Sequence, residues 1–323
     1  MSPRVSAIIT TCARPHLVGR AVRSALGQTL GGIEVVVVVD GPDAATQRAL
    51  TNIDDPRLRV CVRPERGGQG AAINTGVAVA LGEWAALLDD DDEWLPEKLE
   101  RQLSAAESST ARNPVVGCRF VARSEAGDTV WPRRAPARGE PLCEYLFCRR
   151  SLAFGEGILP TSVIFARTEL FRTVPLTEHL RRHCDLDWLI RADRRDDVMV
   201  EIPTGDAPLA VWDIQQDRQR LSNAHDWRYS YEWMEGAREA VTPRAYAGFL
   251  LTWVSFSARC QRDQGAFAFL AREALNRGRP SIIELAVHFA IWMVPMTLRE
   301  KLSRAFAQSA PPTRKPLLDE PTS

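Results

Sequence analysis

The stretch ALLDDDDEWLP, residues 86–96, places four consecutive aspartates directly after an apolar run. Neighbouring carboxylates repel one another, and each raises the pKa of the next. A chain keeps such a cluster where a bound cation relieves the repulsion, or where the segment is only a solvated acidic turn. The segments on either side of the cluster favour one of these two interpretations.

The N-terminal half of the chain alternates short apolar runs with amphipathic segments. β-Branched and apolar runs predict strands at Val5–Thr10, Glu34–Val39, Leu58–Val62 and Trp84–Leu88. Apolar residues at helical spacing predict helices at Pro15–Gln28, Ala44–Thr51, Ala71–Ala80 and Lys98–Glu107. This alternation predicts an α/β fold, with a Rossmann-like, mostly parallel sheet flanked by helices.

Polar side chains follow three of the predicted strands. They are Thr10, Asp40 and the aspartates 89–92. Ligands of parallel sheets bind outside the carboxyl ends of the strands. Hard divalent cations take carboxylate oxygens there and keep positions for phosphate, so this placement favours the cation interpretation over the solvated turn.

Composition excludes several classes of function. The 323 residues are 45% hydrophobic and 25% charged, and 41 basic residues balance 41 acidic ones, which gives no electrostatic case for binding nucleic acid. Seven scattered cysteines without a C-x-x-C pair argue against zinc or a disulfide framework and predict reduced thiols in a cytoplasmic protein. Neither a signal peptide nor a membrane-spanning run is recognisable. The phosphate-loop and dinucleotide-binding glycine motifs are missing as well.

Five segments, in this order, resemble the family 2 glycosyltransferases with the GT-A fold. They are VSAIITTCARPHLVGRAVRSALGQT (5–29), EVVVVVDGPDAAT (34–46), GGQGAAINTGVAVALGEWAALLDDDDEWLPEKLERQ (67–102), ILPTSVIFARTELF (158–171) and HCDLDWLIRAD (183–193). The resemblance covers about residues 4–220 and implies a catalytic domain over residues 1–221. It implies an inverting, metal-dependent enzyme that moves a sugar from a UDP- or dTDP-type donor to an acceptor hydroxyl.

The resemblance also implies how the donor is held. Thr10 and Asp40 would line the base pocket, with Asp40 accepting a hydrogen bond from the ring N–H of uracil or thymine. Asp89 and Asp90 lie in the part of the aspartate motif that contacts the donor nucleotide. Ile73 stands where many relatives carry arginine, which removes one possible contact with the diphosphate and leaves the metal or Arg66 to compensate.

Metal ligands and the general base come from two separate acidic motifs. Asp91, with Asp92 beside it, would hold Mg²⁺ or Mn²⁺. Such an ion stabilises the charge on a departing diphosphate. Asp185 matches the general base, which deprotonates the acceptor from the opposite face of the sugar. Asp187 is a rival for this role, and the sequence also allows Asp185 to be a helix N-cap.

Two departures from the family pattern accompany these matches. Cys184 precedes Asp185 where the family often has glutamate, so the base is kept and its acidic neighbour is not. Gln215 stands about where some relatives offer a histidine to the metal, so no histidine ligand is expected. His183 is expected at the surface.

Strand signals end near Ser222, and helical segments at 226–262, 267–277 and 281–306 predict a C-terminal extension over residues 222–307. Residues 308–323 are rich in proline, serine and threonine and are expected to be a disordered tail. Ser281–Val294 is apolar around nearly its whole circumference, which predicts a buried helix docked on the catalytic domain or on a partner subunit. Contact with a membrane surface at 281–294 is the alternative, and a homodimer through the same helix is also open.

Two other functions compete with sugar transfer. A nucleotidyltransferase would need a glycine-rich, basic loop near the N-terminus, where ITTCARPH offers only Arg14. A non-catalytic nucleotide-sugar-binding module should have lost Asp185. The expected partners are a nucleotide-sugar donor and a carbohydrate or glycolipid acceptor in cell-surface assembly. The expected location is cytoplasmic, including the inner face of the membrane.

Overall fold

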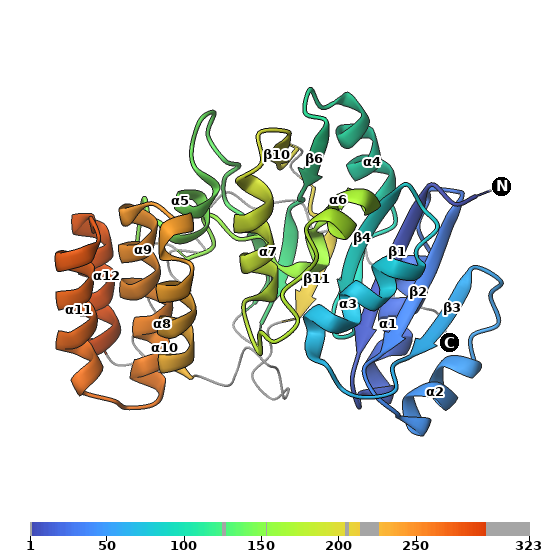
Figure 1. The fold of residues 1–323 in the computed structure, drawn as a ribbon, viewed down its shortest axis with the longest axis horizontal. Coiled ribbons are helices and arrows are strands. Elements are labelled where there is room, and N and C mark those ends of the chain that lie inside the picture. The colour runs from blue at the N-terminus through green and yellow to red at the C-terminus, as the bar shows by residue number, and fades with distance from the viewer. Residues whose placement is uncertain (1, 125–126, 153, 204–206, 214–225, 295–323) are drawn as a thin grey trace.

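The computed structural model describes residues 2–124, 127–152, 154–203, 207–213 and 226–294. An α/β domain occupies one side of the molecule and a bundle of helices the other (Figure 1). The expected boundary between them, at 221 and 222, lies outside the described residues, as do Gln215, the end of the extension and the expected tail.

A seven-stranded sheet forms the centre of the α/β domain. Its strand order is β10-β6-β9-β4-β1-β2-β3. The strands are β1 (Val5–Thr11), β2 (Ile33–Val39), β3 (Leu58–Val62), β4 (Trp84–Asp89), β6 (Asn113–Val116), β9 (Phe165–Arg167) and β10 (Val198–Glu201). The strand β9 runs antiparallel to β4 and β6, and the other neighbours are parallel, which confirms the mostly parallel sheet.

Alternating residues of β2 face opposite sides of the sheet. Val36 and Val38 pack with Ala72 of helix α3 in one cluster. Val35, Val37 and Val39 belong instead to the main core. Valine on both faces is the pattern of a strand covered on both sides.

Seven helices are described in this domain, and the first four correspond to those that the sequence predicts. They are α1 (Pro15–Leu26), α2 (Ala44–Thr51), α3 (Gly68–Val79), α4 (Lys98–Ser108), α5 (Leu142–Phe147), α6 (Thr168–Thr173) and α7 (Cys184–Asp193). α3 begins three residues earlier than expected, because Asp40 accepts hydrogen bonds from the backbone N–H groups of Gly67 and Gly68. Gly68 has a φ of 85°, a conformation that glycine adopts without strain.

The domain also contains a second, four-stranded sheet, which the sequence does not predict. Its order is β5-β11-β7-β8. The strands are β5 (Glu93–Trp94), β7 (Phe120–Arg123), β8 (Thr129–Trp131) and β11 (Ala210–Asp213). β5 begins directly after the four aspartates, so the acidic loop joins the two sheets.

The described part of the extension is helical, as predicted. It contains α8 (Trp227–Gly236), α9 (Pro243–Phe249), a π-helical turn η4 (Leu250–Val254), α10 (Ser255–Cys260), α11 (Gly265–Arg277) and α12 (Ile282–Met293), with a short 3₁₀ turn η3 (Arg238–Ala240) after α8. α5 and α7 lie between this bundle and the central strands (Figure 1). Among the helices described, none combines the length and apolar character that a bilayer crossing requires.

The expectation that α12 is buried around its whole circumference is wrong. Its inner face carries Glu284 and His288, which are 0% and 3% exposed. Glu284 accepts hydrogen bonds from the backbone N–H groups of Ser281 and Arg149, and the His288 ring contacts the Ser255 hydroxyl at 2.8 Å. Since polar side chains occupy the inner face, an apolar stripe points outward: Ile282, Phe289 and Met293 are 86%, 58% and 54% exposed.

Candidate active site

The four aspartates occupy the carboxyl end of β4, beside the ends of β1 and β2. Asp89 ends the strand opposite Thr10, and Asp90, Asp91 and Asp92 form the buried loop that follows. Carboxylate oxygens of Asp89, Asp91 and Asp92 all lie within 4.8 Å of one another. Burial raises the pKa of Asp89 well above its usual value, and the charges of Asp92, Asp91 and Asp185 raise it further.

Asp90 differs from its three neighbours, because it is engaged on the other side of the loop. Its carboxylate accepts a hydrogen bond from Thr11 at 2.7 Å and pairs with Arg14 at 3.0 Å. Arg14 also lies 3.6 Å from Asp91. One guanidinium therefore offsets part of the repulsion within the cluster.

Asp92 is held by two other elements. The hydroxyl of Ser162, in the 3₁₀ turn η1 (Thr161–Val163), donates to Asp92 Oδ2 at 2.6 Å. The backbone N–H of Asp213, at the end of β11, donates to Asp92 Oδ1 at 3.3 Å. These contacts fix the carboxylate without neutralising its charge.

A buried polar network in α4 holds η1 in place through hydrogen bonds to its backbone. The amide of Gln102 in α4 donates to the backbone oxygens of Val116 and Val163, both at 2.8 Å. Lys98, which is 0% exposed, donates to Gln102 at 2.6 Å and lies 4.0 Å over the ring of Trp94. Burial lowers the pKa of Lys98 to about 8.

The donor set of Asp89, Asp91 and Asp92 fits a hard divalent cation. The carboxylates of Asp91 and Asp92, which are buried, and of Asp89, which is partly exposed, supply oxygen ligands at one point. Mg²⁺ binds through one or two carboxylates and keeps the remaining positions for water and phosphate. The arrangement therefore favours the interpretation as a site for Mg²⁺ or Mn²⁺ over the interpretation as a solvated acidic turn.

Asp185 lies on the far side of this cluster, in the first turn of α7. Its Oδ1 accepts from the backbone N–H of Leu186 at 2.8 Å, and the Thr161 hydroxyl lies 3.4 Å from Oδ2. Burial raises the pKa of Asp185, which gives the carboxylate more proton affinity than an exposed aspartate. The N-cap of α7 is His183, so the N-cap interpretation of Asp185 is wrong.

Gln69 of α3 connects the two acidic motifs. Its Nε2 donates to Asp89 Oδ1 at 2.6 Å. Its Oε1 accepts from the Cys184 thiol at 3.3 Å. The Gln69 side chain thus reaches from the end of β4 to Cys184 at the start of α7. Cys184 stands at the position where the resemblance leads one to expect an acidic neighbour of the base.

Asp187 is turned away from the cluster. Thr177 donates to its Oδ2 at 2.7 Å, and Arg191 pairs with the same oxygen at 2.8 Å. Two residues along a helix correspond to more than half a turn, so Asp185 and Asp187 cannot share a face. The structure brings Asp185, and not Asp187, to the four aspartates.

Asp40 holds the start of α3. Its two carboxylate oxygens accept from the N–H groups of Gly67 and Gly68, both at 2.9 Å, and Arg63 pairs with Oδ1 at 3.0 Å. Arg66 packs over Gly41, where an added Cβ would lie 2.7 Å from the Arg66 Cγ. Asp40 and Arg66 therefore line the same edge of the sheet as the aspartates.

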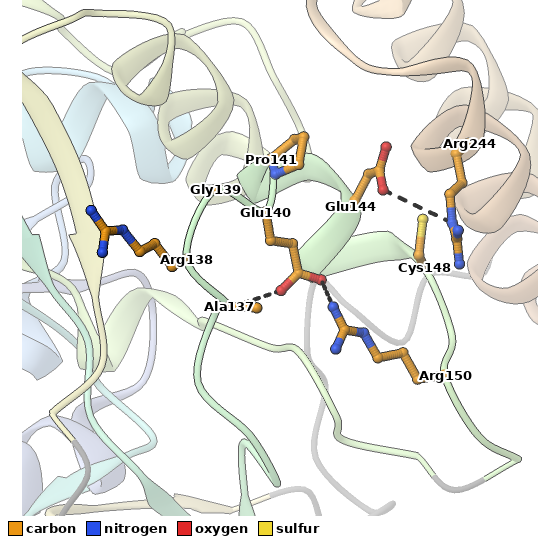
Figure 2. A pocket seen from close by; sticks show the side chains of 9 residues that line it. All are labelled: Ala137, Arg138, Gly139, Glu140, Pro141, Glu144, Cys148, Arg150 and Arg244. Atoms are coloured by element: carbon orange, nitrogen blue, oxygen red, sulfur yellow. Dashed lines mark hydrogen bonds and ion pairs between the residues drawn. The ribbon is translucent and has the colours of Figure 1, made fainter.

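A separate cavity of about 410 Å³ lies between the α5 region and α9, and none of the predicted site residues lines it. Figure 2 shows Arg150 pointing at Glu140, and Arg244 of α9 beside Glu144 and Cys148. The ion pair between Arg150 and Glu140 measures 2.9 Å. Arg150 and Arg244, which line the cavity, thus form ion pairs with Glu140 and Glu144.

Comparison with known proteins agrees with this geometry. The sequence model described as glycosyl transferase family 2 matches residues 6–174, just over half of the chain. The chain belongs to glycosyl transferase family 2. The range includes both the four aspartates and η1, and it ends before α7 and the extension.

Some curated relatives of this family 2 chain carry names from polysaccharide synthesis, and others are named only as uncharacterized glycosyltransferases. The succinoglycan biosynthesis protein ExoO of Rhizobium meliloti is 36% identical over 34% of this chain and 32% of its own length. The amylovoran biosynthesis glycosyltransferase AmsB of Erwinia amylovora is 27% identical over 65% of this chain and 69% of its own length. The chain spans from about a third to just over half of the length of the first four curated relatives that it matches.

Solved structures show that the fold is GT-A. Staphylococcus aureus TarS in complex with UDP-GlcNAc superposes with a TM-score of 0.51 at 16% identity, covering 94% of this chain and 79% of that one. The mannosyltransferase PcManGT of Pyrobaculum calidifontis, in complex with GDP-Man and Mn²⁺, superposes with a TM-score of 0.51 at 15% identity, covering 95% and 86%. These likenesses confirm the predicted fold class.

Sequence reasoning missed four polar residues of this family 2 site. They are Gln69, Thr161, Ser162 and Asp213. Thr161 and Ser162 lie within the fourth segment of the resemblance, which was the available signal. Gln69 lies within the third segment in the same way, whereas Asp213 lies in none of the five, and its contact with Asp92 joins distant parts of the chain.

Proposed function

We propose that this chain is an inverting, metal-dependent glycosyltransferase that moves a sugar from a UDP- or dTDP-type donor to an acceptor hydroxyl. One observation carries the proposal: hydrogen bonds link Asp89, in a cluster of three aspartates suited to a divalent cation, through Gln69 and Thr161 to the carboxylate of Asp185. Inverting transfer in a single displacement requires that the negative charge on the leaving group be stabilised and that a separate base deprotonate the acceptor. Both acidic motifs are present and converge.

The residues have distinct roles in this mechanism. Asp91 and Asp92 would hold Mg²⁺ or Mn²⁺, and Asp89 would offer a third carboxylate. When bound, such an ion supplies positive charge to the departing diphosphate. Thr10, Asp40, Asp90 and Arg66 lie around the nucleotide. Asp185 accepts the proton of the acceptor hydroxyl, and its raised pKa suits this step.

The acceptor is a carbohydrate or glycolipid in cell-surface polysaccharide assembly. Support comes from the names of the relatives, which assign one protein to succinoglycan and another to amylovoran biosynthesis. The solved GT-A neighbours include complexes with UDP-GlcNAc and with GDP-Man. These donors favour a nucleotide sugar as the class of donor, without selecting the sugar.

We also propose that the enzyme works at the inner face of a membrane, through the outward stripe of α12. The exposed residues Ile282, Phe289 and Met293 offer an apolar surface. The basic residues Arg299, Lys301 and Arg304 follow in the sequence. An apolar helix face that is followed in the sequence by basic residues suits an anionic lipid surface better than a second copy of the same chain.

A panel of nucleotide sugars tests the proposal directly. We expect thermal stabilisation and slow hydrolysis of one UDP- or dTDP-sugar in the presence of Mn²⁺, and loss of both with a chelator. The anomeric configuration of the product, followed by NMR, tests inversion. Stabilisation by every nucleotide sugar with no hydrolysis of any would favour a non-catalytic binding module.

A further inference from the structure

His183 adopts a conformation that needs external support. It is the N-cap of α7 and has a φ of 64° and a ψ of 19°, in the left-handed region. Residues other than glycine seldom adopt this conformation, and they do so where the surrounding structure holds them. The position lies two residues before Asp185, so the direction in which α7 starts depends on His183.

The support comes from the helical extension. The His183 Nε2 lies 2.9 Å from the hydroxyl of Ser230 in α8. The ring lies 4.7 Å from the ring of Trp233 in α8 and 5.7 Å from that of Phe249 in α9, measured between centroids. Burial, with a smaller contribution from Arg182, lowers the pKa of His183 to about 3, so the ring is neutral.

The residues before His183 are attached to the same helix. The backbone N–H of Arg181 donates to the Tyr229 hydroxyl at 2.9 Å. The Arg181 guanidinium lies 4.4 Å over the Tyr229 ring and pairs with Asp226, the N-cap of α8, at 3.4 Å. Two successive points of the segment that enters α7 therefore contact α8.

The residues on the donor side of the site are held by other elements than the helical extension. Asp40 follows β2, and the four aspartates follow β4, both in the seven-stranded sheet. Their bonds to Gly67, Ser162 and Arg14 come from the α/β domain. A substitution in α8 should therefore displace Asp185 more than it displaces the residues of the donor site.

We propose that the helical extension positions the general base, and that His183 is the positioning residue through which it does so. The extension fixes the start of α7 and with it the distance of Asp185 from the aspartate cluster. This inference rests on the proposed role of Asp185. It adds a function for the extension, which lies beyond the residues matched by the family model.

The test compares variants of two histidines near α7. His183→Ala removes the contacts with α8, whereas His183→Asn keeps a polar side chain that tolerates the left-handed conformation. His179→Ala is the matched control, because His179 is exposed and lies in the same segment. Two quantities are measured: the kcat for hydrolysis of the nucleotide sugar that the panel identifies, and the Kd for UDP with Mn²⁺.

We expect His183→Ala to lower kcat by about 10- to 100-fold, since a base displaced by about 1 Å can cost a factor of about 100. The Kd for UDP should stay within about twofold, because the donor side rests on the sheet. His183→Asn should restore most of kcat, and His179→Ala should match the native protein. An unchanged kcat in His183→Ala, or an equal loss of UDP binding, overturns the proposal.

Asp185→Asn, measured alongside, separates this inference from the proposed function. Full hydrolysis by Asp185→Asn overturns the base assignment and the inference together. Loss in Asp185→Asn with none in His183→Ala overturns the positioning role alone. Should His183→Ala fail to fold, Tyr229→Phe and Ser230→Ala make the same test: a lower kcat with unchanged UDP binding supports the proposal, and an unchanged kcat overturns it.

Discussion

Ser162 and Asp92, separated by 70 residues in the chain, are joined by a hydrogen bond of 2.6 Å from the serine hydroxyl to Oδ2 of the aspartate. The same hydroxyl accepts from the backbone N–H of Asp89 at 3.1 Å. One side chain of η1 thus contacts the carboxylate of Asp92 and the backbone of Asp89, two of the three residues that could hold a cation. The neighbouring Thr161 contacts Asp185, so η1 also links this cluster to the base.

Ser162→Ala should weaken metal binding while leaving the fold intact. The substitution removes the donor to Asp92, and loss of such an outer partner typically costs about 10- to 100-fold in metal affinity. Titration of Mn²⁺ by calorimetry measures the effect. Thr173→Ala is the control, since in the contacts described its hydroxyl donates only to the backbone oxygens of Glu169 and Leu170, within its own helix. Equal Mn²⁺ affinity in native and Ser162→Ala protein would contradict the assignment.

Asp91→Asn should abolish Mn²⁺-dependent binding of UDP or dTDP and leave the thermal midpoint the same or higher. The amide removes one charge from a repulsive cluster and replaces a carboxylate ligand with a weaker, neutral oxygen. Nucleotide affinity with Mn²⁺ and with a chelator is the measurement. Asp54→Asn, at an exposed aspartate, should change neither. If affinity is indifferent both to the chelator and to Asp91→Asn, the cluster is only a solvated turn.

Asp185→Asn should lower the turnover rate by about 10²- to 10⁴-fold, the contribution of a positioned general base. Donor affinity should change little, because Asp185 contacts Leu186 and Thr161 rather than the nucleotide edge. Asp187→Asn should lose the pairing with Arg191 and cost stability more than rate. Steady-state kinetics of both variants decide between them, and loss of rate in Asp187→Asn alone would move the base two residues along.

Protonation of His183 should destabilise the fold in acid. Its pKa falls from an ordinary 6.5 to about 3 in the folded protein, so the unfolded chain binds more protons between these values. Stability contributed by the neutral ring is therefore complete above about pH 6.5 and is lost as the pH falls towards 3. Thermal midpoints of the native protein and of His183→Asn should converge as the pH is lowered through this window. A constant difference between the two would show that His183 does not titrate there.

Four strands of the central sheet, β1 to β4, were predictable because apolar and β-branched runs indicate them in the sequence, whereas β6, β9 and β10 were not predicted. Five consecutive valines, 35–39, cannot form an amphipathic helix, and the burial of all of them matches a strand covered on both faces. The acidic motif was predictable for the same reason, since it ends such a run. The individual roles within it were not, because the position of Arg14 and Ser162 decides which carboxylate is paired.

The errors of prediction concern partners that are distant in the sequence. Hydropathy cannot indicate that Glu284 would meet the backbone of Arg149, so the apolar face of α12 was expected inside. His183 was expected at the surface, although Trp233 and Ser230 enclose its ring. In both cases a polar side chain is buried because a hydrogen-bond partner from another element offsets its desolvation.

The outward stripe of α12 should bind anionic membranes. Phe289→Ser and Met293→Ser together remove two exposed apolar side chains, and each such loss should weaken binding by about tenfold or more if the side chain enters the lipid. Co-sedimentation with vesicles of phosphatidylglycerol, at low and high salt, measures the effect. Leu81→Ser is the control, because Leu81 is 63% exposed on the α/β domain. Equal sedimentation of all these proteins, or a native protein that dimerises in solution and ignores vesicles, would assign the stripe to a subunit contact instead.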